Sequence, residues 1–438
     1  MRSVKRLLMS RSWPMAIGGT HMQEAIISPS RASASKSLNL LLQSGMLAPS
    51  TTGAYHLLPP LVRSVEKLSN LIDDKMRDHD CQKVFLASLG SKTMWMRSGR
   101  WNSFGEELVK TKIGGMEHCL CPTHEEAICG ILQHFGKQLS HQHCPLRIYQ
   151  TTTKFRNELS PQHGLLRCRE FLMNDLYTVD TDRESAMKTY KEIGEMYDDL
   201  FEVLKIDIKK VKALTGNIGG DLSHEYHILA DIGEDHLLLN NETGECFNSE
   251  YLESVPNLQN FTKVNAIEVG HTFYLGQHYS KKFDLLLSLK HGEKAMCEMG
   301  CYGLGVTRII AACVEKLSLD NGLRWPMQIC PYKVCIILPK GGSKESVEGN
   351  ALGEHLYDTL QTIPQFKGDV IMDDRPKRTL GWKVRHAHLI GHPVVLVIGP
   401  RALSNNPQIE VIFQPAGEST TQYVHVDNVV DTVKSILM

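Results

Sequence analysis

The sequence has almost no net charge, because 48 Lys and Arg residues stand against 49 Asp and Glu over 438 positions. A chain without excess positive charge lacks the general attraction to nucleic acids that basic proteins have, so a polyanion must be bound by a local patch. Long apolar stretches are also missing. The runs at Cys335–Leu338 and Val394–Ile398 are far shorter than the roughly 18 residues that a bilayer span needs. We therefore expect a soluble chain without membrane insertion.

No Cys-x-x-Cys pair occurs among the 12 cysteines, which argues against a zinc ribbon or a disulfide scaffold and favours a reducing compartment. One cluster of soft ligands is dense enough to consider for zinc, but its Cys-x-Cys spacing departs from that of structural zinc sites. We therefore assign no metal to protein side chains. The cluster comprises Cys119, Cys121, His124, His141, His143 and Cys144.

The N-terminal segment contains no acid before Glu24 but carries Arg2, Lys5, Arg6 and Arg11 among several serines. An Arg-rich, Ser-rich and acid-poor start is typical of a mitochondrial transit peptide, which we place at residues 1–36. A disordered basic tail is the alternative. A secretory signal fits less well, because its apolar region would be too short.

The length predicts two or three domains, at about 150 residues each. Apolar residues recur every three or four positions in two segments, and Thr181 with Glu184 reads as a capping box for the second. After Pro326, buried strands alternate with helices, which predicts a separate small α/β domain from residue 327. The expected helices are 61–76, 184–204, 309–314, 348–360, 380–389 and 426–437, and the expected C-terminal strands are 334–338, 370–372, 394–398 and 409–413.

Two segments carry the chemistry. The first is a predicted hairpin that would bring Arg156, Glu158 and Arg167 to one mouth, where the fork of arginine suits phosphate. The second places three glycines from Gly300 before Arg308, at the start of an apolar helix. Glycine lets backbone approach a ligand closely, and a helix N-terminus favours anions. A solvated hairpin would explain the first segment alone, but not both together.

These two segments resemble motifs 2 and 3 of the class II aminoacyl-tRNA synthetases, and further matches resemble the bacterial and mitochondrial prolyl type. The resemblance covers nearly the whole chain after about residue 40. The matching segments are Cys121–Glu126, Lys154–Glu158, Arg169–Met173, Gly219–Glu225, Glu268–Gly276 and Met299–Arg308.

The resemblance implies an α/β protein. Its catalytic domain, residues 37–326, would be an α+β unit with an antiparallel sheet flanked by helices, followed by an α/β anticodon-binding domain at 327–438. It also implies a homodimer in the mitochondrial matrix that joins ATP and proline as prolyl-adenylate and transfers the prolyl group to tRNA(Pro). Mg²⁺ bridging the phosphates is implied by the chemistry. Only about 120 residues separate motifs 2 and 3, so the editing insertion of bacterial relatives is expected to be absent.

Site residues follow from the same resemblance. Arg156 is expected to grip the α-phosphate and the proline carboxylate, Arg308 the γ-phosphate, and Glu158 and Arg167 the nucleotide. The other expected residues are Glu268 and His271 in the ATP pocket, Thr123 and Glu125 for the proline nitrogen, and Phe171, Met173 and Phe273 for its ring. For each of these aromatics taken alone, core packing is the more common role.

In the C-terminal domain, basic residues surround Trp382 without an acid between them, a pattern that suits the bases and phosphates of an anticodon loop. A solvated helix face is the alternative reading. The cations are Arg375, Lys377, Arg378, Lys383 and Arg385. Motif 1 departs from the family, because Ala87 stands where a proline is usual, and this makes the dimer less certain than the active site.

Two other functions are open at this stage. A synthetase-like RNA-binding accessory protein without catalysis would be free to lose its phosphate arginines, and this chain keeps Arg156, Glu158, Arg167 and Arg308. A synthetase for threonine, glycine or histidine is the second alternative, and a zinc-dependent threonyl type would be separated by a metal assay.

Overall fold

The computed structural model describes Met9 and residues 35–135, 139–250, 258–415, 417 and 419–437. The chain divides into two compact units, of which the first comprises Met1–Ser50, Tyr55–Lys67 and Cys313–Met438, and the second Thr51–Ala54 and Leu68–Ala312. The expected transit peptide lies outside the described residues, apart from Met9, Ser35 and Lys36. No helix in the described ranges is both long and apolar enough to cross a bilayer.

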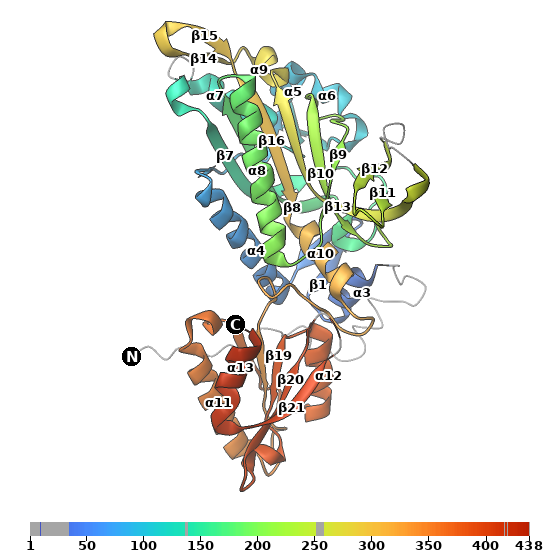
Figure 1. The fold of residues 1–438 in the computed structure, drawn as a ribbon, viewed down its shortest axis with the longest axis vertical. Coiled ribbons are helices and arrows are strands. Elements are labelled where there is room, and N and C mark those ends of the chain that lie inside the picture. Colours follow the sequence, from blue (N-terminus) through green and yellow to red (C-terminus); the bar gives the residue numbers. More distant parts are fainter. Residues whose placement is uncertain are drawn as a thin grey trace. The chain divides into compact units, whose positions relative to one another are not determined.

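In the second unit, the described strands build a nine-stranded sheet (Figure 1). Its main path has the order β12-β11-β13-β16-β8-β7-β3, and β10 pairs with β13 and with β9. Neighbouring strands are antiparallel except β3 and β7, so the antiparallel sheet expected for the catalytic domain is confirmed. The strands are β3 (Gln82–Lys83), β7 (Leu146–Phe155), β8 (Glu170–Asp180), β9 (Lys209–Ala213), β10 (Leu222–Leu229), β11 (Asp235–Asn240), β12 (Cys246–Asn248), β13 (Phe261–Gly276) and β16 (Glu298–Gly305).

Successive side chains of a strand point to opposite faces of the sheet, and the two faces of this sheet have different neighbours. Helix α8 (Arg183–Leu204) covers one face, where Asp180 of β8 accepts a hydrogen bond from Thr189 at 2.9 Å and the ring of Tyr302 on β16 lies 5.9 Å from that of Tyr190. The adjacent positions of these strands therefore face the other side.

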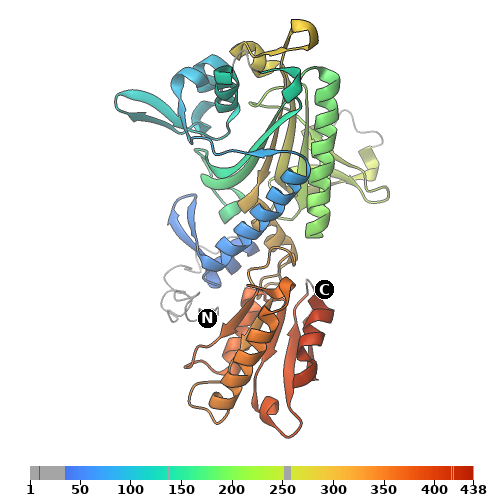
Figure 2. The same cartoon turned by 90° about the vertical axis from the view of Figure 1, so that its left-hand side faces the viewer.

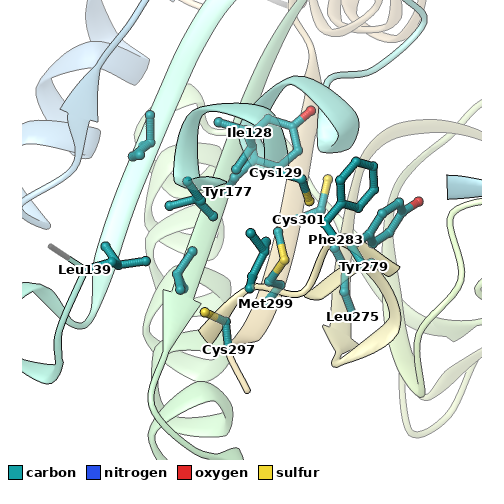
Figure 3. Packing of buried hydrophobic residues seen from close by; sticks show 14 of the residues in the cluster. Ile128, Cys129, Leu139, Tyr177, Leu275, Tyr279, Phe283, Cys297, Met299 and Cys301 are labelled. Atoms are coloured by element: carbon teal, nitrogen blue, oxygen red, sulfur yellow. The ribbon is translucent and has the colours of Figure 1, made fainter. Parts of the chain in front are cut away.

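On that other side, helices α7 (Glu125–Phe135) and α9 (His278–Phe283) pack against β8, β13 and β16 through a buried apolar cluster (Figure 3). Burying a large apolar side chain contributes about 1.5–3 kcal/mol, so this cluster holds the start of α7 firmly against the sheet. The labelled members are Ile128, Cys129, Leu139, Tyr177, Leu275, Tyr279, Phe283, Cys297, Met299 and Cys301.

A smaller three-stranded sheet has the order β4-β6-β5, and its β5–β6 hairpin extends away from the main sheet (Figure 2). Helix α5 (Lys92–Ser98) follows β4 and ends at Gly99, whose φ of 84° is in the left-handed region. This backbone turn suits glycine and starts α6 (Arg100–Ser103) in a new direction. The strands here are β4 (Leu89–Ser91), β5 (Lys110–Ile113) and β6 (Met116–Leu120), and the unit also contains the pair β14 (Leu286–Ser288) and β15 (Lys294–Met296).

The capping-box prediction is wrong at the start of α8. The N-cap is Asp182, whose carboxylate accepts a hydrogen bond from the Ser185 N–H at 2.9 Å, and the helix begins one residue later. Asp and Thr both suit an N-cap, and the aspartate one position nearer the helix takes this role. The hydrogen bonds from the Ser185 N–H and from the Thr181 and Ser185 side chains outweigh the opposing effect of burial and lower the pKa of Asp182 below its ordinary value.

The first unit contains a five-stranded sheet with the order β18-β17-β19-β20-β21, of which β18, β17 and β19 are parallel and the last two pairings antiparallel. The strands are β17 (Val334–Ile337), β18 (Val370–Asp373), β19 (Val394–Val397), β20 (Gln408–Phe413) and β21 (Thr420–His425), and the helices are α11 (Ser346–Gln361), α12 (Leu380–Ile390) and α13 (Val429–Leu437). This confirms the predicted α/β arrangement. The remaining α-helices and β-strands of the described ranges are α3 (Lys36–Gln43), β1 (Leu47–Thr51), β2 (Ala54–Leu57), α4 (Pro59–Asp78) and α10 (Val306–Leu317). All but α3 include residues of both units.

Candidate active site

The strand order brings together segments that are far apart in the sequence. Strand β16 lies between β8 and β13, so that Gly303 is paired with Asp175 on one side and His271 on the other. An added Cβ at Gly303 would meet only the Met173 sulfur, 3.7 Å away. The surrounding protein atoms therefore leave room for a side chain at position 303. Because glycine has no side chain, this part of the cavity floor stays open.

That cavity has a volume of about 290 Å³, and a second one of about 270 Å³ adjoins it through shared lining residues, Glu268 and Arg308. The predicted catalytic-domain residues line one or the other, with Glu125 as the exception. The first is lined by Thr123, Arg156, Phe171, Met173, Glu268, His271, Phe273 and Arg308, and the second by Glu158, Arg167, Glu268 and Arg308.

Two guanidinium groups enter the first cavity from different elements. Arg156 follows β7, its group lies 5.4 Å from the Phe171 ring, and its Nε is buried without a hydrogen-bond partner in the described ranges. Burial, and then the charge of Arg308, lower the pKa of Arg156. Arg308, in the first turn of α10, donates from Nη1 to the Glu268 carbonyl at 3.0 Å. The cavity thus holds cationic charge that the chain itself only partly neutralises.

Glu268 and its neighbours form a hydrogen-bonded group at the cavity wall. His271 Nδ1 lies 2.9 Å from Glu268 Oε1 and 3.7 Å from Glu225 Oε1, and its ring stacks on Phe273 with centroids 3.9 Å apart. Burial alone raises the pKa of Glu268, but the hydrogen bond from His271 and the charges of His271 and Arg308 outweigh it and lower the pKa to about 2. The carboxylate is therefore ionised at neutral pH.

Sequence reasoning gave no role to Glu225, although it ends one of the matching segments. Its Oε2 lies 2.9 Å from His227 Nε2 and accepts from Asn248 Nδ2 at 2.9 Å, and it lines the first cavity. Donor atoms of Glu225, Glu268 and His271 lie within 4.8 Å of one another, the one such group of His, Cys and acid side chains in the part of the chain that the structure describes. The considered Cys/His cluster from Cys119 to Cys144 does not gather in this way.

Around Thr123, the two expected proline-nitrogen acceptors occupy different places. Thr123 lines the cavity, but Glu125 is completely buried behind it and accepts a hydrogen bond from the Thr123 hydroxyl at 2.8 Å. Cys301 and Asp175, which had no predicted role, also line the cavity. Only strand pairing could have indicated them, because neither lies in a charged or glycine-rich pattern.

In the second cavity, Arg167 donates to Glu158 at 2.9 Å and also contacts Glu234, which in turn contacts Gln162. These bonds to Glu158 and Glu234, only partly opposed by burial, raise the pKa of Arg167 above its ordinary value. Glu234 follows β10 in the sequence and was not predicted. The hairpin was predicted to bring Arg156 and Arg167 to one mouth, but Arg156 lines the first cavity and Arg167 the adjoining second one.

The predicted basic patch of the first unit is only partly at the surface. Arg375 is 4% exposed and forms two hydrogen bonds to Asp373, of 2.8 and 2.6 Å, while Lys383 is 0% exposed and donates to the carbonyls of Leu338 and Asp373. These two cations are therefore corrected to interior positions, because they satisfy buried acceptors. Lys377 and Arg385 are exposed. The ring of Trp382 lies 4.4 Å from the Arg378 guanidinium.

Two family profiles match the chain. The profile described as the tRNA synthetase class II core domain (G, H, P, S and T) matches residues 109–317, and the profile described as the anticodon binding domain matches residues 333–436.

Full-length relatives match as well. The probable mitochondrial proline–tRNA ligase of Mus musculus is 43% identical over 390 residues, covering 87% of this chain and 82% of the relative. The corresponding protein of Schizosaccharomyces pombe is 39% identical and covers 86% and 89%. Among solved structures, the prolyl-tRNA synthetase of Cryptosporidium parvum complexed with L-proline and AMP superimposes with a TM-score of 0.73 at 19% identity, over 92% of this chain and 74% of that one. That last similarity concerns the fold.

Proposed function

The chain belongs to the proline–tRNA ligases, which are class II aminoacyl-tRNA synthetases, and from this premise we propose that the two adjoining cavities are where it joins proline to ATP. The chain is a proline–tRNA ligase of mitochondrial translation. In the reaction, the proline carboxylate attacks the α-phosphorus, pyrophosphate leaves, and the prolyl group passes to the terminal ribose of tRNA(Pro).

The convergence of Arg156 and Arg308 on one cavity beside Glu268 carries this proposal. No nucleophile of the enzyme is needed, so the chain contributes positioning and charge neutralisation. Arg156 would bind the α-phosphate and the attacking carboxylate, and its buried Nε, which has no hydrogen-bond partner among the described residues, supports this role. Arg308 would bind the γ-phosphate. The pair formed by Glu158 and Arg167 would orient the nucleotide in the second cavity.

Mg²⁺ bound to the triphosphate would neutralise part of its charge during the transfer. The residues fit this ion in part. The carboxylates of Glu225 and Glu268 are the oxygen donors that Mg²⁺ prefers, whereas the third member of the group, His271, supplies nitrogen. We propose that the two carboxylates hold the ion together with the phosphates, and that His271 keeps the Glu268 carboxylate oriented.

Proline recognition is proposed for residues of the first cavity, next to Arg156. The Thr123 hydroxyl donates a hydrogen bond to Glu125, which leaves the lone pairs of the hydroxyl oxygen for the ring nitrogen. Phe171, Met173 and Phe273 would enclose the three methylenes. Such an apolar slot distinguishes proline from a smaller amino acid by only about 1–3 kcal/mol per methylene.

We propose that the catalytic domain comprises residues 37–326 and the anticodon-binding domain residues 327–438. The profile ranges, 109–317 and 333–436, lie within these bounds. Within the second, Lys377, Arg378 and Trp382 are the proposed contacts to tRNA(Pro). The mitochondrial matrix is the proposed location, with residues 1–36 as the transit peptide.

A homodimer is also proposed. Apolar side chains stand in solvent around the motif 1 segment, where Phe85 is 86% exposed. Register places Leu89, Ile113 and Met116 on one face of the small sheet, and they are 41%, 51% and 66% exposed. An exposed apolar face of this kind marks an interaction surface. The family resemblance implies a second copy of this chain as the partner. Ala87, at the unusual motif 1 position, accepts a hydrogen bond from the buried His124 through its carbonyl.

The test is ATP–pyrophosphate exchange with each of the twenty amino acids. A response to proline far above the others supports the proposal. An accessory protein without catalysis would give no exchange with any amino acid, and a synthetase of another specificity would respond to a different one. The retained arginines argue against an accessory protein without catalysis, and the identity to proline–tRNA ligases argues against another specificity.

A further inference from the structure

Arg100 is a buried arginine outside the cavity. A series of hydrogen bonds leads from it, through Glu125, to residues that line the cavity. Arg100 is 2% exposed, and its guanidinium lies between the rings of Trp95, Phe104 and Tyr279, at 4.9, 5.2 and 5.7 Å. Such an apolar surrounding excludes water. A charge placed there must be neutralised by acids of the chain itself.

Two acids at the start of α7 supply this neutralisation. Arg100 Nη1 donates to Glu125 Oε2 at 2.8 Å and lies 3.2 Å from both oxygens of Glu126. Burial raises the pKa of Glu126 above its ordinary value. Burial also raises the pKa of Glu125, but the charge of Arg100 and the hydrogen bonds from Arg100 and Thr123 together outweigh it and lower that pKa. Of the two acids, Glu125 makes the shorter hydrogen bond to Arg100.

The Glu125 carboxylate is bonded on both oxygens. Glu125 Oε2 also accepts from the Thr123 hydroxyl at 2.8 Å, and Oε1 accepts from the Cys301 thiol at 3.2 Å. Thr123 precedes α7 and Cys301 lies on β16, and both line the first cavity, which Glu125 does not reach. A single carboxylate thus connects two walls of the cavity that come from different elements.

We propose that Arg100 is a positioning residue for proline activation, because it holds the Glu125 carboxylate in the orientation that fixes the Thr123 hydroxyl and the Cys301 thiol at the cavity wall. The inference rests on the proposed function. Arg100 touches no substrate. Loss of Arg100 should weaken the use of proline rather than of ATP. In the described ranges, the arginines and acids assigned to ATP form no hydrogen bond with the connected residues Arg100, Glu125, Thr123 and Cys301.

The experiment uses the full chain and compares Arg100→Met, Glu125→Gln and the double variant in proline-dependent ATP–pyrophosphate exchange. Proline is varied at saturating ATP, and ATP at saturating proline. We expect kcat/KM for proline to fall about 100-fold in Arg100→Met, the upper range for residues that orient a functional group, with KM for ATP close to that of the wild type. Because both residues act through one chain of bonds, the double variant should be no slower than the slower single variant.

A matched control is Arg97→Met. Arg97 lies on α5, the helix before α6 and Arg100, and its guanidinium likewise lies near an aromatic ring, that of Phe283 at 4.9 Å, but it pairs with Asp284 at the surface. Its loss should leave both KM values unchanged. If Arg100→Met does not fold, Arg100→Lys serves instead, because it keeps the charge and loses the fork, and a loss of about tenfold confined to proline is expected.

Equal losses for proline and ATP, or multiplicative losses from Arg100 and Glu125, would overturn the inference. Neither result would affect the proposed function. That function fails only if the wild type itself gives no proline-dependent exchange.

Discussion

The buried ion pair of the first unit allows a prediction that separates structural from RNA-binding arginines. In Arg375→Met, the side chain keeps most of its length but the charge is lost. Asp373 is 1% exposed and loses the donors Nε and Nη2 of Arg375. We expect the variant to be unstable rather than selectively weak in tRNA binding.

The magnitude follows from what the carboxylate loses. Removing one partner of a buried pair costs about 3–5 kcal/mol, because the other charge stays buried. The Arg375 guanidinium also lies 4.7 Å from the Trp382 ring, a contact worth about 0.5–2 kcal/mol. For units of between about 100 and 200 residues, 1 kcal/mol shifts Tm by roughly 2–8 °C. The loss should therefore lower Tm by at least about 6 °C, taking the low end of both ranges.

The assay combines thermal unfolding of the full chain with aminoacylation and exchange kinetics, and Lys377→Met is the control. Lys377 is exposed, so its loss should change stability by less than about 0.5 kcal/mol while raising KM for tRNA. Asp373→Asn combined with Arg375→Met should recover part of the stability, because the carboxylate at position 373 is then no longer buried without its arginine partner. A stable Arg375→Met protein with a raised KM for tRNA would refute the reasoning.

Three further predictions concern the catalytic unit. Arg308→Gln should lower kcat/KM for ATP in the exchange assay about 10²–10³-fold, the scale of a lost transition-state donor, and an unchanged value would place the γ-phosphate elsewhere. Glu268 has a depressed pKa of about 2, so the stability it contributes is present above its ordinary pKa and is lost as the pH falls towards 2. The difference in unfolding free energy between wild type and Glu268→Gln in urea should accordingly shrink from pH 7 to pH 3. Because no editing insertion is expected, purified protein should not hydrolyse alanyl-tRNA(Pro), and rapid deacylation would contradict this.

Much of the first unit's α/β pattern could be predicted, because its parallel strands are buried on both faces and read as continuous apolar runs. Strands β17 to β20 lie where the sequence places them. Strand β21, Thr420–His425, was missed because its first four residues are exposed and carry no apolar pattern. An edge strand of this kind is recognised by its pairing with β20, which the sequence does not reveal.

The site was predictable where charge and glycine recur in short segments, as at Arg156 and Arg308. It was not predictable where strand pairing decides the neighbours. Asp175 and Cys301 line the cavity because β16 lies between β8 and β13, an order that periodicity does not contain. The interior position of Glu125 was hidden for the same reason, since its partners Arg100 and Cys301 lie 25 and 176 positions away.

The partners of a cation within the chain indicate its role better than the motif in which it stands. Arg375 and Lys383 belong to a basic run, yet each finds buried acceptors and stabilises the fold. Arg156 is the opposite case, because it forms no ion pair with an acid in the described ranges, whereas Arg375 and Arg100 do. Its Nε is also buried and unpaired there, which costs stability unless a ligand provides the missing acceptor. Arg100 lies between them: it is neutralised by Glu125, but that acid also holds two groups of the cavity wall. Folding and substrate binding therefore use the same interaction, and they differ in whether the anion belongs to the protein or to its substrate.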